Sequence, residues 1–437
     1  MGLPLMSVEN QPAALQDTHR CPAGAYGWTP LMLTAGLFFL IGFVTWLNGP
    51  LISFVRVSFS LDDISAFFIP LVFYFSYFFF AIPASWVITR TGLKRGLSLS
   101  LMVMALGMAG TGQFIAAGVY GAALAGLLVL GCGLALLQVA VNPYVSFLGP
   151  AQKAAQRIAI MGICNKFAGI LAPIVLATLV MGDIEGVAHQ AATMTDPAAR
   201  AALLGQFVQA IYWPYLGMAV LMLLTAGAVA LSSLPDIQPP DTASPLSTDP
   251  SSPPTRQMLL SPHVLCGIGA MFLYVGVEVM AGDAIGTYAQ GFGLPLNQTR
   301  FFTALTLTGM LAGYCLGMVC TPRFCSQERY TFYSCMAGAV LSLLAFMAHG
   351  YSAVLCVALL GVANAMIFPG LFPTVLKNTG KAAPLVAACL VMAYCGGGIV
   401  PQLFVWLKTL FGFQGVFTSL TVTGYALIAL YMRRSAV

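Results

Sequence analysis

This chain of 437 residues contains unusually few charged residues. Only 7% of the residues are Asp, Glu, Lys or Arg, whereas soluble domains carry about 25%. Thirteen acidic and 18 basic residues are too few to cover the surface of a soluble protein, and 59% of the residues are hydrophobic. The composition therefore excludes a soluble enzyme and a disordered chain. It predicts an all-α polytopic membrane protein.

Motifs for several other functions are missing. No basic run is long enough to follow a phosphate backbone, so nucleic acid is not an expected partner. The 11 cysteines form no CxxC pair and no cluster with histidine, so we expect neither disulfides nor a metal site. HExxH, GxSxG and P-loop patterns are absent as well. We expect no enzyme activity and no bound cofactor.

Apolar segments of bilayer-spanning length make up most of the chain. Windows of about 20 residues, the length that crosses a bilayer as a helix, identify twelve of them. They lie at residues 29–55, 64–89, 97–116, 119–147, 158–182, 208–233, 262–290, 299–322, 331–349, 352–376, 383–409 and 412–432. The first is too long for a signal-peptide core, so we expect no cleaved signal.

Two longer connections interrupt this series. Residues 183–207 are polar, and residues 234–260 are rich in Pro, Ser and Thr, which predicts a flexible linker. The predicted order is a tail, a six-helix half, the linker, a second six-helix half and a tail, at residues 1–28, 29–233, 234–260, 261–433 and 434–437. With a cytoplasmic N-terminus, thirteen Lys and Arg fall on the cytoplasmic side and four on the other. Both termini and the linker are therefore expected to be cytoplasmic.

The two halves resemble each other in sequence. The stretch from Gly169 to Pro173 has a counterpart 228 residues later, from Gly397 to Pro401. Lys153 and the two alanines after it recur at Lys381 with the same offset. Repeats at one offset indicate duplicated halves in parallel orientation, which is the arrangement of a major facilitator fold with twelve transmembrane helices.

Three charged residues lie well inside apolar segments. Glu278 and Asp283 are in the seventh segment, and Lys166 is in the fifth. At 1.5 Å per residue, Lys166 and Glu278 reach nearly the same depth, where a charge needs a partner or water. Either they only form an ion pair between the halves, or an acid there titrates or binds a cation during transport. Asp283 lies nearer the outer end. An alternative interpretation is that it is a carboxylate at a helix end, in contact with water.

Polar and aromatic side chains at similar depth are candidates for substrate contacts. Amides offer a donor and an acceptor, as sugar hydroxyls require, but each one alone is equally compatible with interhelical bonding. The candidate amides are Asn48, Gln138, Asn142, Asn165 and Asn364. Aromatic rings that are able to stack on a sugar, or simply to pack, are Trp46, Tyr74 and Tyr288.

Several of these residues lie in recognisable motifs. The run GFVTWLNGPLI at residues 42–52 resembles the first helix of the fucose/glucose–galactose permease family of sugar:cation symporters. The run LQVAVNPYV at residues 137–145 is the strongest of the other matches. Further similar stretches are residues 73–77, 82–84, 157–166, 274–278 and 368–373.

The resemblance implies a sugar transporter of the glucose/galactose type. The fucose-specific branch has acidic residues where this chain has Gly49 and Gln138, so its proton route is not carried over. The resemblance implies a monomer in a bacterial inner membrane, with a sugar substrate and a co-transported proton or sodium ion. Glucose, galactose, N-acetylglucosamine and fucose remain open as substrates. An uncoupled uniporter and a sugar sensor are the competing functions.

The loop after the second segment contains a degenerate form of the superfamily's glycine and basic motif. Its residues are Arg90, Gly92, Lys94 and Arg95. The motif implies gating residues that hold the cytoplasmic side closed in one state. Basic residues at this position are equally expected from topology alone.

Overall fold

The structure is a computed structural model that describes residues 28–147, 154–232, 259–321, 323–377, 379 and 382–435, and within these ranges it contains helices and no strand. A few side chains within these helices are not described: residues 28–29, 142–143, 146–147, 154–159 and 384. The expected tail up to residue 27, the linker up to residue 258, Lys153 and Lys381 lie outside the described residues.

The N-terminal half comprises the helices up to Leu231. They are α1 (Trp28–Thr45), α2 (Asn48–Ser58), α3 (Asp63–Ala66), α4 (Phe68–Thr91), α5 (Leu93–Ala116), α6 (Tyr120–Phe147), α7 (Ala154–Leu179), α8 (Ile184–Thr193), α9 (Pro197–Gln209) and α10 (Tyr212–Leu231).

The C-terminal half comprises the helices from Pro262 onward. They are α12 (Pro262–Gly282), α13 (Ile285–Gln290), α14 (Leu296–Thr299), α15 (Phe302–Cys320), α16 (Gln327–Met347), α17 (Gly350–Asn364), α18 (Ile367–Leu376), α19 (Ala383–Met392), the 3₁₀ turn η4 (Ala393–Cys395), α20 (Gly396–Phe411) and α21 (Phe413–Ser435).

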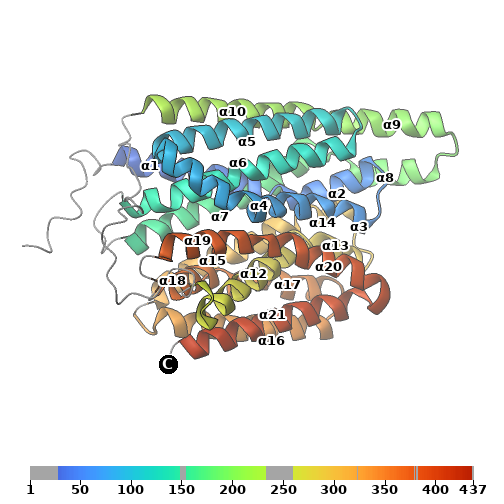
Figure 1. The fold of residues 1–437 in the computed structure, drawn as a ribbon. Helices are drawn as coiled ribbons and strands as arrows, with labels where there is room; N and C mark the ends of the chain where they lie inside the picture. Colours follow the sequence, from blue (N-terminus) through green and yellow to red (C-terminus); the bar gives the residue numbers. More distant parts are fainter. Residues whose placement is uncertain are drawn as a thin grey trace, which may run out of the picture.

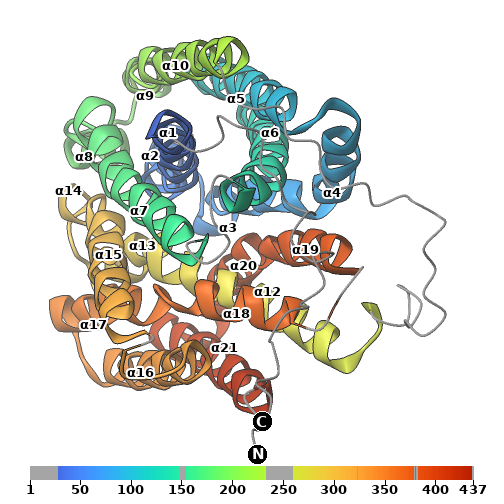
Figure 2. The same cartoon turned by 90° about the vertical axis from the view of Figure 1, so that its left-hand side faces the viewer.

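The two halves form two layers of roughly parallel helices (Figure 1). Viewed along the helices, each half is a curved group, and the two groups face each other (Figure 2). At their interface α7 packs against α15, and α4 packs against α19, η4 and α20. We call the end at which α1 and α12 begin and α10 and α21 end the near end (Figure 1). The opposite end, with α3, α8, α9 and α14, is the far end (Figure 1).

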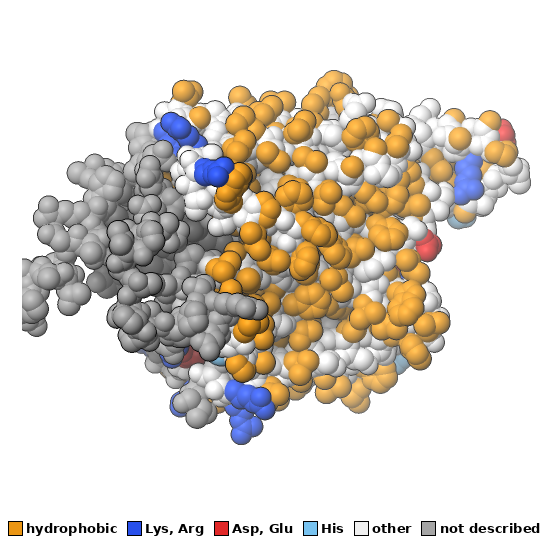
Figure 3. Space-filling model, viewed as in Figure 1, with side chains coloured by type: hydrophobic (Ala, Val, Ile, Leu, Met, Phe, Trp, Pro, Cys, Tyr) orange, Lys and Arg blue, Asp and Glu red, His pale blue; other side chains and the backbone are white. Residues whose placement is uncertain are grey.

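The described helices confirm the twelve predicted spans. Twelve helical stretches are long and apolar enough to cross a membrane, and all match segments expected from the sequence. On the face seen in Figure 3, charged side chains gather toward the two ends, and mostly apolar surface lies between them. Many large side chains of this kind are exposed, such as Leu106, Trp213 and Leu224. Such a surface suits lipid rather than water.

The polar connection at residues 183–207 is largely helical. Asp183 begins α8 by accepting a hydrogen bond from the Gly186 N–H, and Asp196 begins α9 by accepting one from the Ala198 N–H. Pro197 at the first position of α9 suits a helix start, because its missing N–H would have no partner there. These two helices extend beyond the rest of the far end (Figure 1).

Glycines allow the same close helix contact in both halves. A Cβ on Gly131 of α6 would lie 2.7 Å from the Phe73 carbonyl oxygen of α4. A Cβ on Gly361 of α17 would lie 2.1 Å from the Thr306 carbonyl oxygen of α15. Small residues at such crossings let backbones approach closely, which drives helix association in lipid. The recurrence of this contact, and of Pro173 and Pro401 inside α7 and α20, agrees with duplicated halves.

This packing predicts that alanine substitution changes the unfolding temperature differently at two glycines. Gly361→Ala should lower the unfolding temperature in detergent, because overpacking against backbone costs about 1–3 kcal/mol. Gly227→Ala in α10 has no atom within 4 Å of its new Cβ. It should leave stability unchanged or raise it, because Ala favours helix by up to about 1 kcal/mol. Equal unfolding temperatures for the two variants would contradict the close contact.

Candidate functional site

An ion pair joins the two halves in the middle of the bundle. The Lys166 Nζ of α7 lies 2.8 Å from the Glu278 Oε1 of α12. Their side chains are 9% and 12% exposed, so both are largely withdrawn from solvent. The Lys166 ammonium also lies 4.7 Å from the centre of the Trp46 ring. The contact that their similar depth suggested is therefore present, with a cation–π contact in addition.

Trp46 lies in a break in the first transmembrane helix, between α1 and α2. The sequence predicts a break at Gly49 and Pro50, since proline has no N–H to continue the helical bonding. The structure places the break slightly earlier, at Trp46 and Leu47, with Pro50 in the first turn of α2. The buried indole fills a space between two glycines from different halves. A Cβ on Gly169 would lie 2.6 Å from the ring, and a Cβ on Gly282 would lie 2.3 Å from it. Trp46 thus packs tightly across the interface beside Lys166.

The seventh transmembrane helix is broken as well, between α12 and α13. Hydroxyl groups of α15 accompany this break. Thr303 Oγ1 donates to the Gly282 carbonyl at 2.9 Å, and Thr306 Oγ1 donates to the Ala281 carbonyl at 2.8 Å. These bonds satisfy carbonyls near the end of α12, where helical partners run out. Asp283 lies in this break and is buried, with 2% of its surface exposed.

The candidate amides have different surroundings. Gln138 is half-buried, and its Nε2 donates to the Tyr77 hydroxyl at 2.9 Å. Asn165 is half-buried, and its Nδ2 donates to the Phe38 carbonyl at 3.2 Å. Asn364 is fully buried in the C half, where its Oδ1 accepts from Tyr425 at 2.9 Å. Asn48 is also buried. The side chain of Asn142 lies outside the described residues.

An aromatic cluster lies at the interface next to Gln138. Tyr74 and Tyr77 of α4 have ring centroids 6.0 Å apart, and Tyr77 lies 5.4 Å from Tyr394 of η4. Sequence reasoning named Tyr74 but missed Tyr77 and Tyr394. Tyr77 follows one turn after the first ring, in a stretch matched to the permease family, which is the signal that could have found it.

Tyr288 lies elsewhere. It is completely buried in the C half, where its ring packs against Phe417 with centroids 4.7 Å apart. Its hydroxyl donates to the Ala345 carbonyl at 3.2 Å. We therefore leave Tyr288 out of the site that we propose below.

Charged groups fasten the halves together at the far end. Asp63 of α3 accepts from Arg56 of α2 at 2.8 Å, and its other oxygen contacts Lys408 of α20. Nearby, Gln402 Nε2 donates to the Ile64 carbonyl at 3.1 Å. We call Asp63, Lys408, Gln402 and Ile64 the far-end latch. Sequence reasoning assigned these charges to topology and missed the contact.

A second far-end contact involves the C-terminal end of α7. The guanidinium of Arg300, just before α15, donates to the Ala177 carbonyl at 3.4 Å and also to the Gly182 carbonyl. Carbonyls at a helix C-terminus carry partial negative charge, so a cation is favourable there. The polar contacts described between the halves thus lie at mid-depth and at the far end.

The basic loop at the near end makes contacts within the N half. The Lys94 Nζ donates to the Ser232 carbonyl at 2.6 Å, and Arg90 lies 3.7 Å from the centre of the Trp86 ring. Arg95 is exposed, and Gly92 ends α4 with a φ of 82° that only glycine adopts easily. In this conformation the hydrogen bond of Lys94 and the ring contact of Arg90 both lie within the N half.

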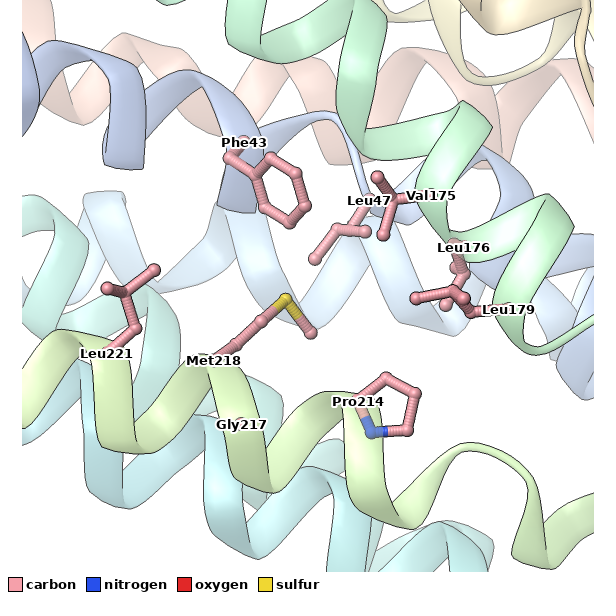
Figure 4. A pocket seen from close by; sticks show the side chains of 9 residues that line it. All are labelled: Phe43, Leu47, Val175, Leu176, Leu179, Pro214, Gly217, Met218 and Leu221. Carbon is pink, nitrogen blue, oxygen red and sulfur yellow. The ribbon is translucent and has the colours of Figure 1, made fainter.

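A separate apolar cavity of about 210 Å³ lies on the N half, and neither residue of the ion pair lines it (Figure 4). It is open to the outside between α1, α7 and α10, and it is lined by Phe43, Leu47, Val175, Leu176, Leu179, Pro214, Gly217, Met218 and Leu221. This lining offers sugar hydroxyls no side-chain partner. No group of three or more metal-ligating side chains occurs among the residues that the structure describes.

The latch gives a direct prediction about the far end. Lys408→Met should speed amide hydrogen exchange in α3 by roughly two- to fivefold, because a partly exposed ion pair contributes about 0.5–1 kcal/mol. Lys377→Met, at the near end, removes an equal charge from an exposed position and should leave α3 unchanged. Equal exchange in α3 for wild type and Lys408→Met would show that the latch does not hold the halves.

Comparison with known proteins places this geometry in a family. A "Glucose/galactose transporter" from Brucella abortus is 28% identical over 412 residues, covering 93% of each chain. An "L-fucose-proton symporter" from Escherichia coli is 27% identical over 375 residues, covering 85% of each chain. These relatives are transporters, in agreement with the expectation that the chain is not an enzyme.

The fold also matches a solved structure. A crystal structure of a major facilitator transporter, FucP, in the outward conformation superposes with a TM-score of 0.73 at 23% identity, covering 93% of this chain and 98% of that one. The family model described as Major Facilitator Superfamily matches residues 34–401, which include helices of both halves. This twelve-helix, multi-pass membrane protein therefore belongs to the major facilitator superfamily.

Proposed function

We propose that this protein takes up a hexose of the glucose/galactose class across the bacterial inner membrane, in symport with a proton. The observation that carries the proposal is the Lys166–Glu278 ion pair, which joins the halves at mid-depth. A transporter of this fold moves its substrate by alternating access around a central site. Sugar names among the relatives support the substrate class, and the name of the fucose relative supports the proton.

Sugar binding is assigned to polar and aromatic groups within the membrane-spanning part of the bundle. Gln138 and Asn165 are the leading candidates, because both are polar, half-buried and close to the interface. Trp46 and Tyr74 supply aromatic surface. Asn48, Asn142 and Asn364 remain secondary candidates. Amides bind hydroxyls specifically because an unpaired buried amide is costly when the sugar is absent or altered.

Coupling is assigned to Glu278 with Lys166 as its charge partner. A nearby ammonium favours the ionised carboxylate, so Glu278 releases its proton when the halves bring Lys166 close. When Glu278 is separated from Lys166 in a site that excludes water, it loses that partner and binds a proton. In a symport cycle, the proton therefore enters from the far side with the sugar and leaves toward the near side. Asp283 is the alternative coupling acid.

Orientation and gating complete the proposal. The near end is cytoplasmic, because Lys and Arg are concentrated on that side. Arg90, Lys94 and Arg95, positioned by Gly92, are proposed to hold the near end closed in the outward-facing state. The protein is proposed to act as a monomer, since each chain carries its own complete interface between halves.

Uptake into proteoliposomes tests the function. Labelled glucose, galactose, N-acetylglucosamine and fucose should be compared under imposed proton and sodium gradients. We expect accumulation of glucose or galactose that requires the proton gradient. Accumulation driven only by sodium would change the coupling ion, and equilibration without accumulation would identify a uniporter. Transport of none of the four sugars would reject the proposal.

The amide assignment predicts a loss of affinity. Gln138→Ala should weaken sugar binding by about 1–3 kcal/mol, because a buried hydrogen-bond partner is lost. Gln113→Ala, at an exposed position on α5, is the matched control and should bind normally. Asn165→Ala is the second test of the site, read alongside its unfolding temperature because Asn165 also bonds α1. Normal sugar affinity in folded Gln138→Ala and Asn165→Ala would remove the amides from the site.

The coupling assignment predicts a split between exchange and accumulation. Glu278→Gln should keep sugar exchange but lose gradient-driven accumulation, because an amide cannot bind and release a proton. The double variant Lys166→Met with Glu278→Gln should be more stable than Lys166→Met alone, since the single variant leaves an unpaired buried carboxylate. Normal accumulation by Glu278→Gln would transfer the coupling role to Asp283.

A further inference from the structure

Asp283 is a buried acid without the partners that a charge requires. It is 2% exposed, and neither carboxyl oxygen has a hydrogen-bond partner. The hydroxyls of Thr303 and Thr306 lie nearby but donate to the backbone carbonyls of Gly282 and Ala281. An ionised carboxyl in such a place is strongly disfavoured, whereas a protonated one is tolerated.

Part of the surroundings of Asp283 comes from the other half of the molecule. Gly49, in the first turn of α2, is so close that a Cβ there would lie 3.0 Å from the Asp283 Oδ1 and 2.5 Å from the Thr303 Oγ1. Trp46 covers the adjacent Gly282. The breaks of the first and seventh transmembrane helices thus close over this side chain.

The charged groups near Asp283 do not neutralise the negative charge that its ionised carboxylate would carry. On its own element, Glu278 of α12 carries a charge of the same sign and is bound to Lys166. From α4, the titratable neighbour is the neutral, buried Tyr74. α2 presents the backbone of Gly49, and α15 presents the hydroxyl of Thr303. Arg56, farther along α2, is bound to Asp63.

We propose that Asp283 takes up a proton from water on the far side whenever the far end closes. The proposal rests on the alternating access assigned above. When the two helix breaks separate, Asp283 meets water and releases the proton to the same side. This proton therefore does not cross the membrane, and Glu278 remains the carrier of the transported one. Asp283 makes far-end closure favourable in acid and less favourable as the pH rises.

Hydrogen exchange of the sugar-free protein tests this proton site. Far-end peptides from residues 59–67 and 291–301 are compared at about pH 5.5 and about pH 8, after correction for the intrinsic exchange rate. In wild type, protection should fall as the pH rises, by up to about tenfold per pH unit while Asp283 titrates. Protonation of Asp63 in the latch would change protection with the opposite sign.

Two variants test whether Asp283 causes the pH dependence of far-end protection. Asp283→Asn mimics the protonated side chain, so its far-end peptides should stay protected at both pH values. Glu185→Gln, an exposed far-end acid in α8, should retain the wild-type pH dependence. The proposal is overturned if wild type shows no loss of protection with pH, or if Asp283→Asn retains it. Because this readout uses no sugar and no gradient, it stands or fails separately from symport.

Discussion

The ion pair between Lys166 and Glu278 is the interaction on which the rest of the site depends. It joins α7 to α12 with 2.8 Å between the Lys166 Nζ and the Glu278 Oε1, in a chain of which only 7% of the residues are charged. A charge at this depth is unfavourable without a partner, so neither residue is stable there in isolation. Trp46 lies against the Lys166 ammonium and packs between Gly169 and Gly282. The halves therefore cannot move apart without changing the surroundings of both charges.

Closure in this conformation is built from two kinds of contact. Charged and polar groups hold the far-end surface, through Asp63 with Lys408 and through Arg300 with the end of α7. Deeper in the bundle, the breaks of the first and seventh transmembrane helices meet at Gly49 and Asp283. Broken helices are common at transporter sites because they free backbone groups and allow tight approach. Each of these contacts is noncovalent, as alternating access requires.

Much of the fold could be predicted because hydrophobic length alone identifies a membrane helix. A break in the first transmembrane helix was also predictable from Gly49 and Pro50, since proline has a local effect on the backbone, although the break lies at Trp46 and Leu47, just before α2. The break beside Asp283 was not, because it contains no proline and is accompanied by hydroxyls of Thr303 and Thr306 from another helix.

The site was predictable only in part. Helix depth suggested that Lys166 and Glu278 could meet, because few other buried charges exist. The contact between Asp63 and Lys408 spans 345 residues of sequence, and isolated charges at segment ends are indistinguishable from topology signals. Tyr288 shows a further limit, because depth in the membrane does not reveal which way a side chain faces.

The protonation state of Glu278 tests the central claim most directly. Infrared difference spectroscopy distinguishes ionised from protonated carboxyls, and Glu278→Gln identifies the band of this residue. In protein held with the far end closed, for example by a disulfide between cysteines introduced at Asp63 and Lys408, the account predicts an ionised Glu278. A protonated-carboxyl band in that state that disappears in Glu278→Gln would contradict the proposed link between the ion pair and proton release.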